Sequence, residues 1–349
     1  MTDPHGTAAF KSRVDGVLAD FLARETDAFL AVDPDLAPVA EQVRAAAAHG
    51  KRLRAAFCYW GWRAAGQPDS APLVRAAAAM ELVHAAAIVH DDLIDDSPLR
   101  HGRPTAHVAL RAALRRRPRA ATAARSLAVL VGDLLMSLAG QLFVTSGLPG
   151  AYLARARPLW AALARDLVAG ECLEILRTGA APDTAESLRV IRYKTAKYTV
   201  EQPLLIGGAL AGAGTRLRDG YSAYGLPLGE AFQLRDDLIG LFGDPAVTGK
   251  ANPDDLRARR PTALLAETWR AADAADRALL RGLLGRRLDD AGVETVRGIM
   301  RRLRAPESVE RMITERVGDA VRALDGMALS PPAAEALTSL AHAAAVRQQ

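Results

Sequence analysis

The sequence predicts an all-α protein, on three observations. Its 349 residues are 50% hydrophobic, 24% charged and only 5% aromatic, and the abundance of Ala, Leu and Arg favours helix. One helical pattern follows another along the chain, and no strand-like alternation is long enough to build a sheet. Only short Pro or Gly breaks separate these segments, so we expect one domain over residues 1–349.

Caps and helix breakers set the expected order of the helices. Asp69 or Ser70 caps the fourth helix, whose first turn tolerates Pro72, and Pro203 predicts a kink in the seventh. Residues 243–255 form a loop rich in Gly, Pro and Asp, after which smaller helices complete the C-terminal third. The longer helices are expected at Ala8–Phe29, Ala37–Ala48, Lys51–Ala65, Ala71–Asp95, Ala120–Thr145, Pro149–Thr178, Asp183–Ala211 and Leu217–Asp237, the last irregular near Gly225 and Pro227.

Charge and cysteine content limit the class of protein. The net charge of +5 comes from arginines spread along many helices, so a small polyanionic substrate explains the excess as well as nucleic acid does, and we expect no nucleic-acid partner. Cys58 and Cys172 are too few for a disulfide framework or a zinc site, which is typical of a reducing compartment. The N-terminus does not resemble a signal peptide, and Gly and Pro interrupt the longest uncharged stretch, Leu134 to Ala154. We therefore expect a cytoplasmic protein without a membrane span.

Two acidic clusters each end an apolar helical stretch. They are Asp91-Asp92-Leu93-Ile94-Asp95-Asp96 and Asp236-Asp237-Leu238-Ile239-Gly240. Residues four apart share a helix face, so Asp91 and Asp95 project together, and Asp92 with Asp96 forms a neighbouring row. Such stacked charges cost stability, and a cation removes the cost. Because Mg²⁺ takes carboxylate and phosphate oxygens, the pair of clusters predicts a shared magnesium and diphosphate site.

Cationic residues in apolar surroundings indicate anion binding. Gly50-Lys51-Arg52-Leu53-Arg54 opens a helix, where the dipole favours an anion, and Lys51 and Arg54 share a face at spacing three. Taken alone, such a run is more often a solvated helix start. His84 lies two turns before Asp91 on the same side and can donate to a phosphate, although a lone helical His is more often a satisfied core residue.

The loop after the first acidic cluster carries Arg100 and His101 between Gly and Pro residues. The Arg100 fork matches phosphate oxygens bidentately, whereas His101 can assist only by hydrogen bonds or partial charge. A second basic stretch, Arg111 to Arg119, suits a partner or a membrane surface, but a solvated loop explains it better.

Further along the chain, Lys194 and Thr195 combine a cation with a hydroxyl, which suits an oxyanion. Gln233 precedes Asp236 by three residues and therefore shares its helical face, near the expected substrate headgroup. Lys250 follows a glycine in the adjoining loop, where it can close over a phosphate.

Together these segments resemble the trans-polyprenyl diphosphate synthases, the family of farnesyl and geranylgeranyl diphosphate synthases. The resemblance spans most of the chain, and the second half is similar to actinobacterial geranylgeranyl diphosphate synthases, in which the second acidic motif also ends without its last Asp. It rests on five motifs in the family order: Gly50 to Arg54, His90 to Thr105, Tyr193-Lys194-Thr195, Gly229 to Asp237 and Gly249-Lys250.

The resemblance implies a large antiparallel helix bundle of the isoprenoid synthase type around a deep central cavity, in a homodimer. It implies three Mg²⁺ ions, two shared by Asp91 and Asp95 and the third held by Asp236. Isopentenyl diphosphate would be bound by Lys51, Arg54, His84 and His101, and the allylic diphosphate by Arg100, Lys194, Thr195, Gln233 and Lys250. The implied reaction is ionisation of the allylic C–O bond, attack by the isopentenyl alkene, and proton loss.

This chain departs from the family pattern at several of these positions. His101 stands where a second Arg is usual, which weakens the expected acceptor site. Gly240 replaces the final Asp of the second acidic motif, and Arg260 replaces the usual Lys before Pro-Thr. Glu171 and Glu174 stand where the family commonly has Gln and Asp. The ionising half therefore matches the family better than the condensing half.

Product length should depend on Ala86 and Ala87, about one turn before Asp91, where an aromatic residue would block a growing chain. These small residues favour a product longer than farnesyl diphosphate, with geranylgeranyl diphosphate the best candidate. Two other functions stay open. A terpene cyclase on this fold would explain His101 and Glu171, whereas a catalytically silent partner subunit would be expected to lack an Asp of the first motif.

Overall fold

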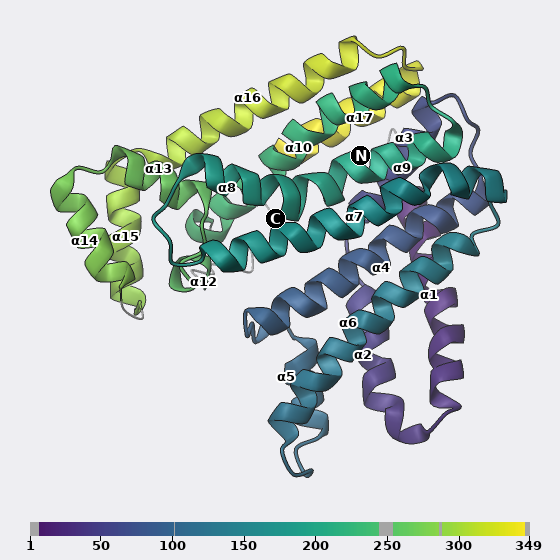
Figure 1. Ribbon diagram of the computed structural model, residues 1–349, viewed down its shortest axis with the longest axis horizontal. Coiled ribbons are helices and arrows are strands. Elements are labelled where there is room, and N and C mark those ends of the chain that lie inside the picture. Colours follow the sequence, from purple (N-terminus) through teal and green to yellow (C-terminus); the bar gives the residue numbers. More distant parts are fainter. Residues whose placement is uncertain (1–6, 101, 244–253, 286–287, 346–349) are drawn as a thin grey trace. The chain divides into compact units, whose positions relative to one another are not determined.

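Helices make up nearly all of the described chain. The computed structural model describes residues 7–100, 102–243, 254–285 and 288–345. Within these ranges the helices are joined by short turns and a single two-stranded hairpin, so the predicted all-α fold class is confirmed (Figure 1). The chain divides into two compact units, one ending at Arg157 and including Ile206–Gly212, the other comprising Pro158–Leu205 and the residues from Ala213 onward. The single domain over residues 1–349 stays a prediction.

The first unit is built around α4 (Ala71–Ile94), which lies side by side with α6 (Ala120–Val144) (Figure 1). Ala76–Ala79 on α4 are fully buried, and their methyl groups let the neighbouring helices approach closely. At Gly132 on α6 an added Cβ would lie 2.1 Å from Nε2 of His90, so a larger residue there would displace the His90 ring. The unit also contains α1 (Thr7–Leu30), the 3₁₀ turn η1 (Pro34–Leu36), α2 (Ala37–Ala47), α3 (Leu53–Ala64), α5 (Ala106–Ala113), the start of α7 (Gly150–Arg177) and the end of α9 (Gln202–Ala211).

Local signals set most helix ends, with exceptions that the sequence did not indicate. Ser70 is the N-cap of α4, since its side chain accepts from the Leu73 amide, whereas Asp69 pairs with Arg13. α3 begins at Leu53, two residues later than expected. The loop after α4 contains a hairpin, β1 (Leu99–Arg100) with β2 (Arg103–Pro104), and then α5, neither of which the sequence pattern predicted.

The second unit centres on α10 (Thr215–Phe242), which packs against α16 (Ala305–Asp325) and against η2 (Arg192–Glu201). Leucines of α10 enter an apolar core that also takes Leu264, Val309 and Ile313. α10 is one continuous helix through Pro227. The remaining elements are the rest of α7, α8 (Thr184–Ile191), the start of α9, α12 (Asp254–Arg257), α13 (Ala263–Ala271), α14 (Ala274–Leu284), α15 (Asp290–Arg302) and α17 (Pro331–Ala345).

The segment η2 is a π-helix, which is rare at this length and typical of functional sites. It ends just before Pro203, whose missing N–H removes a hydrogen bond to the preceding turn. The sequence predicted a kink at this proline within one helix over Asp183–Ala211. The structure instead divides this stretch into the α-helix α8, the π-helix η2 and the α-helix α9.

Among the described residues, α4 and α6 are long and apolar enough to cross a membrane by length and composition alone. In the most apolar part of each, 72% of α4 and 44% of α6 is buried inside the protein. Buried core helices pass the same test, so the absence of a membrane span stays a prediction.

Candidate active site

The first acidic motif lies at the C-terminal end of α4. Asp91 is in the last helical turn, and Asp95 is the C-cap, its amide donating to the Asp91 carbonyl at 2.9 Å. Asp96 leaves the helix with φ of 53°, in the left-handed region. The expected row of Asp92 and Asp96 is therefore wrong, because the helix ends before Asp96. Asp96 instead pairs with Arg125 at 2.7 Å.

Arg100, on β1, neutralises the first motif. Its Nη2 lies 2.5 Å from Oδ1 of the buried Asp92 and 3.2 Å from Oδ2 of Asp91. Burial opposes its charge, but the hydrogen bond and charge of Asp92, with the charge of Asp91, raise the pKa of the Arg100 guanidinium. The structure thus brings Arg100 to the acidic motif, where its contacts are with carboxylates.

The segment from Gly50 to Arg54 is an irregular turn that leads into α3. Because Lys51 precedes the helix, the predicted shared helical face of Lys51 and Arg54 is wrong. Lys51 is exposed, Arg54 is buried, and His84 is partly buried on α4. The charged residue that organises this turn is Arg52, which is 4% exposed and has a φ of 56°.

Arg52 connects three parts of the first unit. Its Nε donates to Oδ1 of Asp15 on α1 at 2.6 Å, and its Nη2 donates to the Ala47 carbonyl at the end of α2 at 2.8 Å. Sequence reasoning missed this role. The local signal was Gly50, whose φ of 140° indicates a sharp turn two residues before Arg52.

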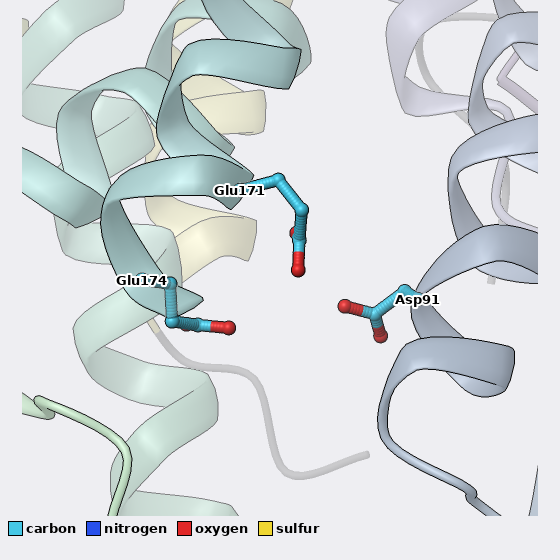
Figure 2. A group of neighbouring side chains, drawn as sticks. All are labelled: Asp91, Glu171 and Glu174. Atoms are coloured by element: carbon cyan, nitrogen blue, oxygen red, sulfur yellow. The ribbon is translucent and has the colours of Figure 1, made fainter. Parts of the chain in front are cut away.

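In the second unit, α7 carries Glu171 and Glu174 on adjacent turns, and both side chains extend from the same side of the helix (Figure 2). Lys194 Nζ on η2 lies 2.8 Å from Oε2 of Glu171 and 2.5 Å from Oε2 of Glu174. Gly170 permits this approach, because a Cβ there would lie 2.2 Å from the Lys194 amide nitrogen.

Thr195 and Gln233 both belong to the predicted allylic set, and the structure brings them together. Thr195 Oγ1 donates to Oε1 of Gln233 at 2.7 Å, and Nε2 of Gln233 donates to Oδ1 of Asp237 at 2.9 Å. Gln233 thus bonds to Asp237 instead of Asp236. Burial raises the pKa of Asp237 well above its ordinary value, and the charge of Asp255 adds to this, against the opposing Gln233 hydrogen bond. Asp236, the predicted metal ligand, is partly buried on the same helix.

A small hollow of about 20 Å³ lies beside the second acidic motif. Arg260 is one of its lining residues, with Nη1 3.0 Å from Oδ1 of Asp255 and Nε 3.8 Å from Oε2 of Glu174. The lining residues are Asp237, Gly240, Leu241, Asp255, Leu256, Arg260, Thr262, Leu264 and Leu265. Gly240 therefore leaves open space where the resemblance implies another carboxylate.

Each unit carries carboxylates of a kind that fits magnesium. Asp91 and Asp95 in the first unit, and Glu171, Glu174 and Asp236 in the second, offer hard carboxylate oxygens, the ligand type that Mg²⁺ prefers. His101 and Lys250 lie outside the described residues. Ala86 is fully buried on α4 and Ala87 is partly buried, so their effect on product length stays a prediction.

Known proteins resemble this chain over most of its length. The polyprenyl synthetase family model matches residues 38–300. A (2E,6E)-farnesyl diphosphate synthase of Mycobacterium tuberculosis is 34% identical over 255 residues, which are 70% of this chain and 63% of that relative. The octaprenyl diphosphate synthase of Escherichia coli is 30% identical over 305 residues, 86% of this chain and 87% of that protein.

A solved structure agrees with this result. The geranylgeranyl pyrophosphate synthase from Corynebacterium glutamicum, complexed with isoprenyl diphosphate and magnesium, has a TM-score of 0.93 and 29% identity, with both chains fully covered. The helical fold is that of the isoprenoid synthases. This chain belongs to the polyprenyl synthetase family.

Proposed function

We propose that this protein is a Mg²⁺-dependent short-chain trans-prenyltransferase that condenses isopentenyl diphosphate with an allylic diphosphate, with geranylgeranyl diphosphate as its product. One observation supports this above the others: the fold matches, at a TM-score of 0.93, a synthase whose structure holds isoprenyl diphosphate and magnesium. The family relatives are named as prenyl diphosphate synthases, which supports the same class of reaction.

The carboxylates have the role of metal ligands in this proposal. Asp91 and Asp95 hold two of three Mg²⁺ ions, and Asp236 holds the third. When bound, Mg²⁺ would neutralise the negative charge that develops on the departing pyrophosphate. Because the hollow beside Gly240 has no carboxylate from that position, we expect the third ion to be held less tightly than the first two.

The allylic diphosphate is bound by cations and hydrogen-bond donors of this chain. Lys194 contacts Glu171 and Glu174, and its ammonium would be able to bind phosphate oxygens when Mg²⁺ takes those carboxylates as ligands. Arg100 and Lys250 add positive charge, and Thr195 and Gln233 orient the headgroup by hydrogen bonds. These donors stabilise the leaving pyrophosphate more than the intact ester, which is the condition for catalysis.

The acceptor, isopentenyl diphosphate, is bound by Lys51, Arg54, His84 and His101. Arg52 holds the turn that carries the first two of these residues, through Asp15 and the end of α2. His101 supplies less charge than an arginine, so we expect weak binding of the acceptor.

The bond changes follow from this arrangement. The allylic C–O bond breaks, and its electron pair leaves with pyrophosphate. The alkene electrons of isopentenyl diphosphate then form the new C–C bond to the allylic cation. A proton is lost from the condensed cation to pyrophosphate, which restores a double bond. Apolar walls that exclude water protect the cation from hydrolysis.

Product length, assembly and location complete the proposal. The relatives make farnesyl, geranylfarnesyl and octaprenyl diphosphates, so family membership allows several lengths. The small side chains of Ala86 and Ala87 support a C20 product. We further propose a cytoplasmic homodimer without a membrane span.

The deciding experiment incubates the purified protein with Mg²⁺ and farnesyl diphosphate, with and without labelled isopentenyl diphosphate. We expect label in geranylgeranyl diphosphate. A cyclised hydrocarbon formed without label would support a terpene cyclase instead, and no turnover with any allylic diphosphate would support a catalytically silent subunit. Replacing Ala87 with Phe should shorten the product, and an unchanged product would refute its proposed role.

A further inference from the structure

Glu230 of α10 is a buried carboxylate held between two arginines. It is 5% exposed. Its Oε1 lies 2.8 Å from both Nε and Nη2 of Arg192 on η2, and its Oε2 accepts from Nε of Arg316 on α16 at 2.8 Å. All three residues belong to the second unit. Both oxygens are used by arginines, so Glu230 can influence a reaction only through the segments that it joins.

The joined segments touch through their backbones. A Cβ on Gly229 would lie 2.4 Å from Cα of Ala196, and a Cβ on Gly225 would lie 2.8 Å from Cα of Glu201. The two glycines are four residues apart and share a face of α10. Contact along this face lets η2 approach α10 closely. Because the two glycines have no side chains to interlock with η2, this contact alone does not prevent one segment from sliding past the other. The clamp of Arg192, Glu230 and Arg316 resists that sliding.

The same two segments carry three of the candidate allylic residues. Lys194 and Thr195 follow Arg192 on η2, and Gln233, which bonds to Asp237, follows Glu230 on α10. The hydrogen bond from Thr195 on η2 to Gln233 on α10 requires a fixed register between the two segments, and Gln233 in turn donates to Asp237 within α10. A shift of about 1 Å in such an array is enough to cost as much as 100-fold in rate.

Stability alone is a poor reason to bury this charge. Glu230 and most of Arg316 are removed from water, whereas Arg192 stays half exposed. Burying the carboxylate costs several kcal/mol, and well-packed apolar residues often serve stability as well or better. Fixing one geometry among alternatives is the better-supported use of such a group. The π-helix η2 makes such a fixed geometry more important, because its wide turns are held by the surrounding contacts and not by ideal helix geometry.

We infer that Glu230 is a positioning residue for the allylic diphosphate: through Arg192 and Arg316 it fixes the register that aligns Lys194 and Thr195 with Gln233 and Asp237. This role rests on the proposed prenyltransferase function for its substrate. It concerns the allylic headgroup and leaves the acceptor residues of the first unit unaffected.

The test compares Glu230→Gln with Glu267→Gln. Glu267 is a matched control, because it is also 5% exposed in the second unit and joins three helices, through Thr184 on α8, Arg270 on α13 and Ser308 on α16. Both variants lose a buried carboxylate that holds helices together. Only Glu230 connects the segments that carry the candidate site.

Steady-state kinetics should separate the two variants. We expect Glu230→Gln to raise the KM for the allylic diphosphate about 10- to 100-fold with the KM for isopentenyl diphosphate unchanged, and Glu230→Asp to recover part of the loss. Glu267→Gln should change neither KM more than about twofold, even if its Tm falls as much as that of Glu230→Gln. Equal kinetics for the two variants, or equal increases in both KM values for Glu230→Gln, would show a purely structural role.

A calorimetric titration makes the inference independent of turnover. Mg²⁺ with inorganic pyrophosphate serves as the probe for wild type, Glu230→Gln and Glu267→Gln. Weaker pyrophosphate binding in Glu230→Gln alone supports the inference, and equal binding in all three proteins overturns it. If wild type fails to incorporate isopentenyl diphosphate, the proposed function fails and this titration still decides the role of Glu230. If Glu230→Gln does not fold, Arg316→Lys replaces it with the same expected and contrary results.

Discussion

The two acidic motifs are stabilised in different ways. Asp91 and Asp92 are neutralised by Arg100, only 9 and 8 residues further along the chain. Asp237 bonds instead to Gln233, which takes its other hydrogen bond from Thr195, 38 residues earlier. The neighbouring clamp on Glu230 includes Arg316, 86 residues later. The first motif is thus held by one cation nearby in the sequence. The second is held by a bond within its own helix, from Gln233 to Asp237, and by a contact with a separate segment through Thr195.

The largest change in activity should come from removing a negative charge of the first acidic motif. Replacing Asp91 with Asn should lower kcat about 10³-fold, because the Mg²⁺ that would stabilise the departing pyrophosphate loses a proposed charged ligand. Replacing Asp96 with Asn is the matched control, since Asp96 turns away from the helix to Arg125, and kcat should stay within about threefold. Comparable losses in both variants would mean that the motif acts by total charge, and not through Asp91 itself.

The second motif should be more sensitive to packing. Replacing Gly229 with Ala puts a methyl group 2.4 Å from Cα of Ala196, and backbone must move, so we expect a loss of about 1–3 kcal/mol in the free energy of unfolding. Gly240 on the same helix has no neighbour within 4 Å, so Gly240→Ala should gain up to about 1 kcal/mol from helix propensity. Urea unfolding of both variants provides the measurement. Equal stability changes would contradict close contact between α10 and η2.

The smallest effect should appear in the pH dependence of the first unit. Burial opposes ionisation of Asp15, but hydrogen bonds from Lys11 and Arg52 lower its pKa below the ordinary 3.8. A lowered folded pKa adds stability above the unfolded value, and this stability is lost as the pH falls through the folded pKa. Asp15→Asn should therefore lose at most about 1 kcal/mol at pH 7 and show a flatter decline below pH 4. Chemical unfolding at several pH values tests this, and parallel curves for both proteins would exclude the Asp15 contribution.

The same contrast explains what could be predicted from the sequence. The fold class, the cap at Ser70 and the spacing of Asp91 and Asp95 depend on neighbours in the chain, and these expectations could be made from propensity and period alone. The pairing of Thr195 with Gln233 was reached only through the family resemblance, which assigned both to one substrate.

The missed features depend on distant residues or unusual backbone. Arg52 appeared to be one more solvent-exposed cation of a basic run, because nothing local shows that Asp15 and the end of α2 surround it. Glu230 lies inside a recognised motif, but its arginine partners come from two other segments. The π-helix has no periodic signature distinct from that of an α-helix over 10 residues, so a proline kink was the nearest expectation.

We propose that both acidic motifs serve one magnesium-dependent prenyl transfer, and this proposal can be tested directly. The most direct measurement is the incorporation of labelled isopentenyl diphosphate into a longer prenyl diphosphate by wild type, Asp91→Asn and Asp236→Asn, each with Mg²⁺ and with excess EDTA. We predict incorporation by wild type with Mg²⁺, none with EDTA, and a severe loss in both variants. Undiminished incorporation in EDTA, or in either variant, would contradict the account.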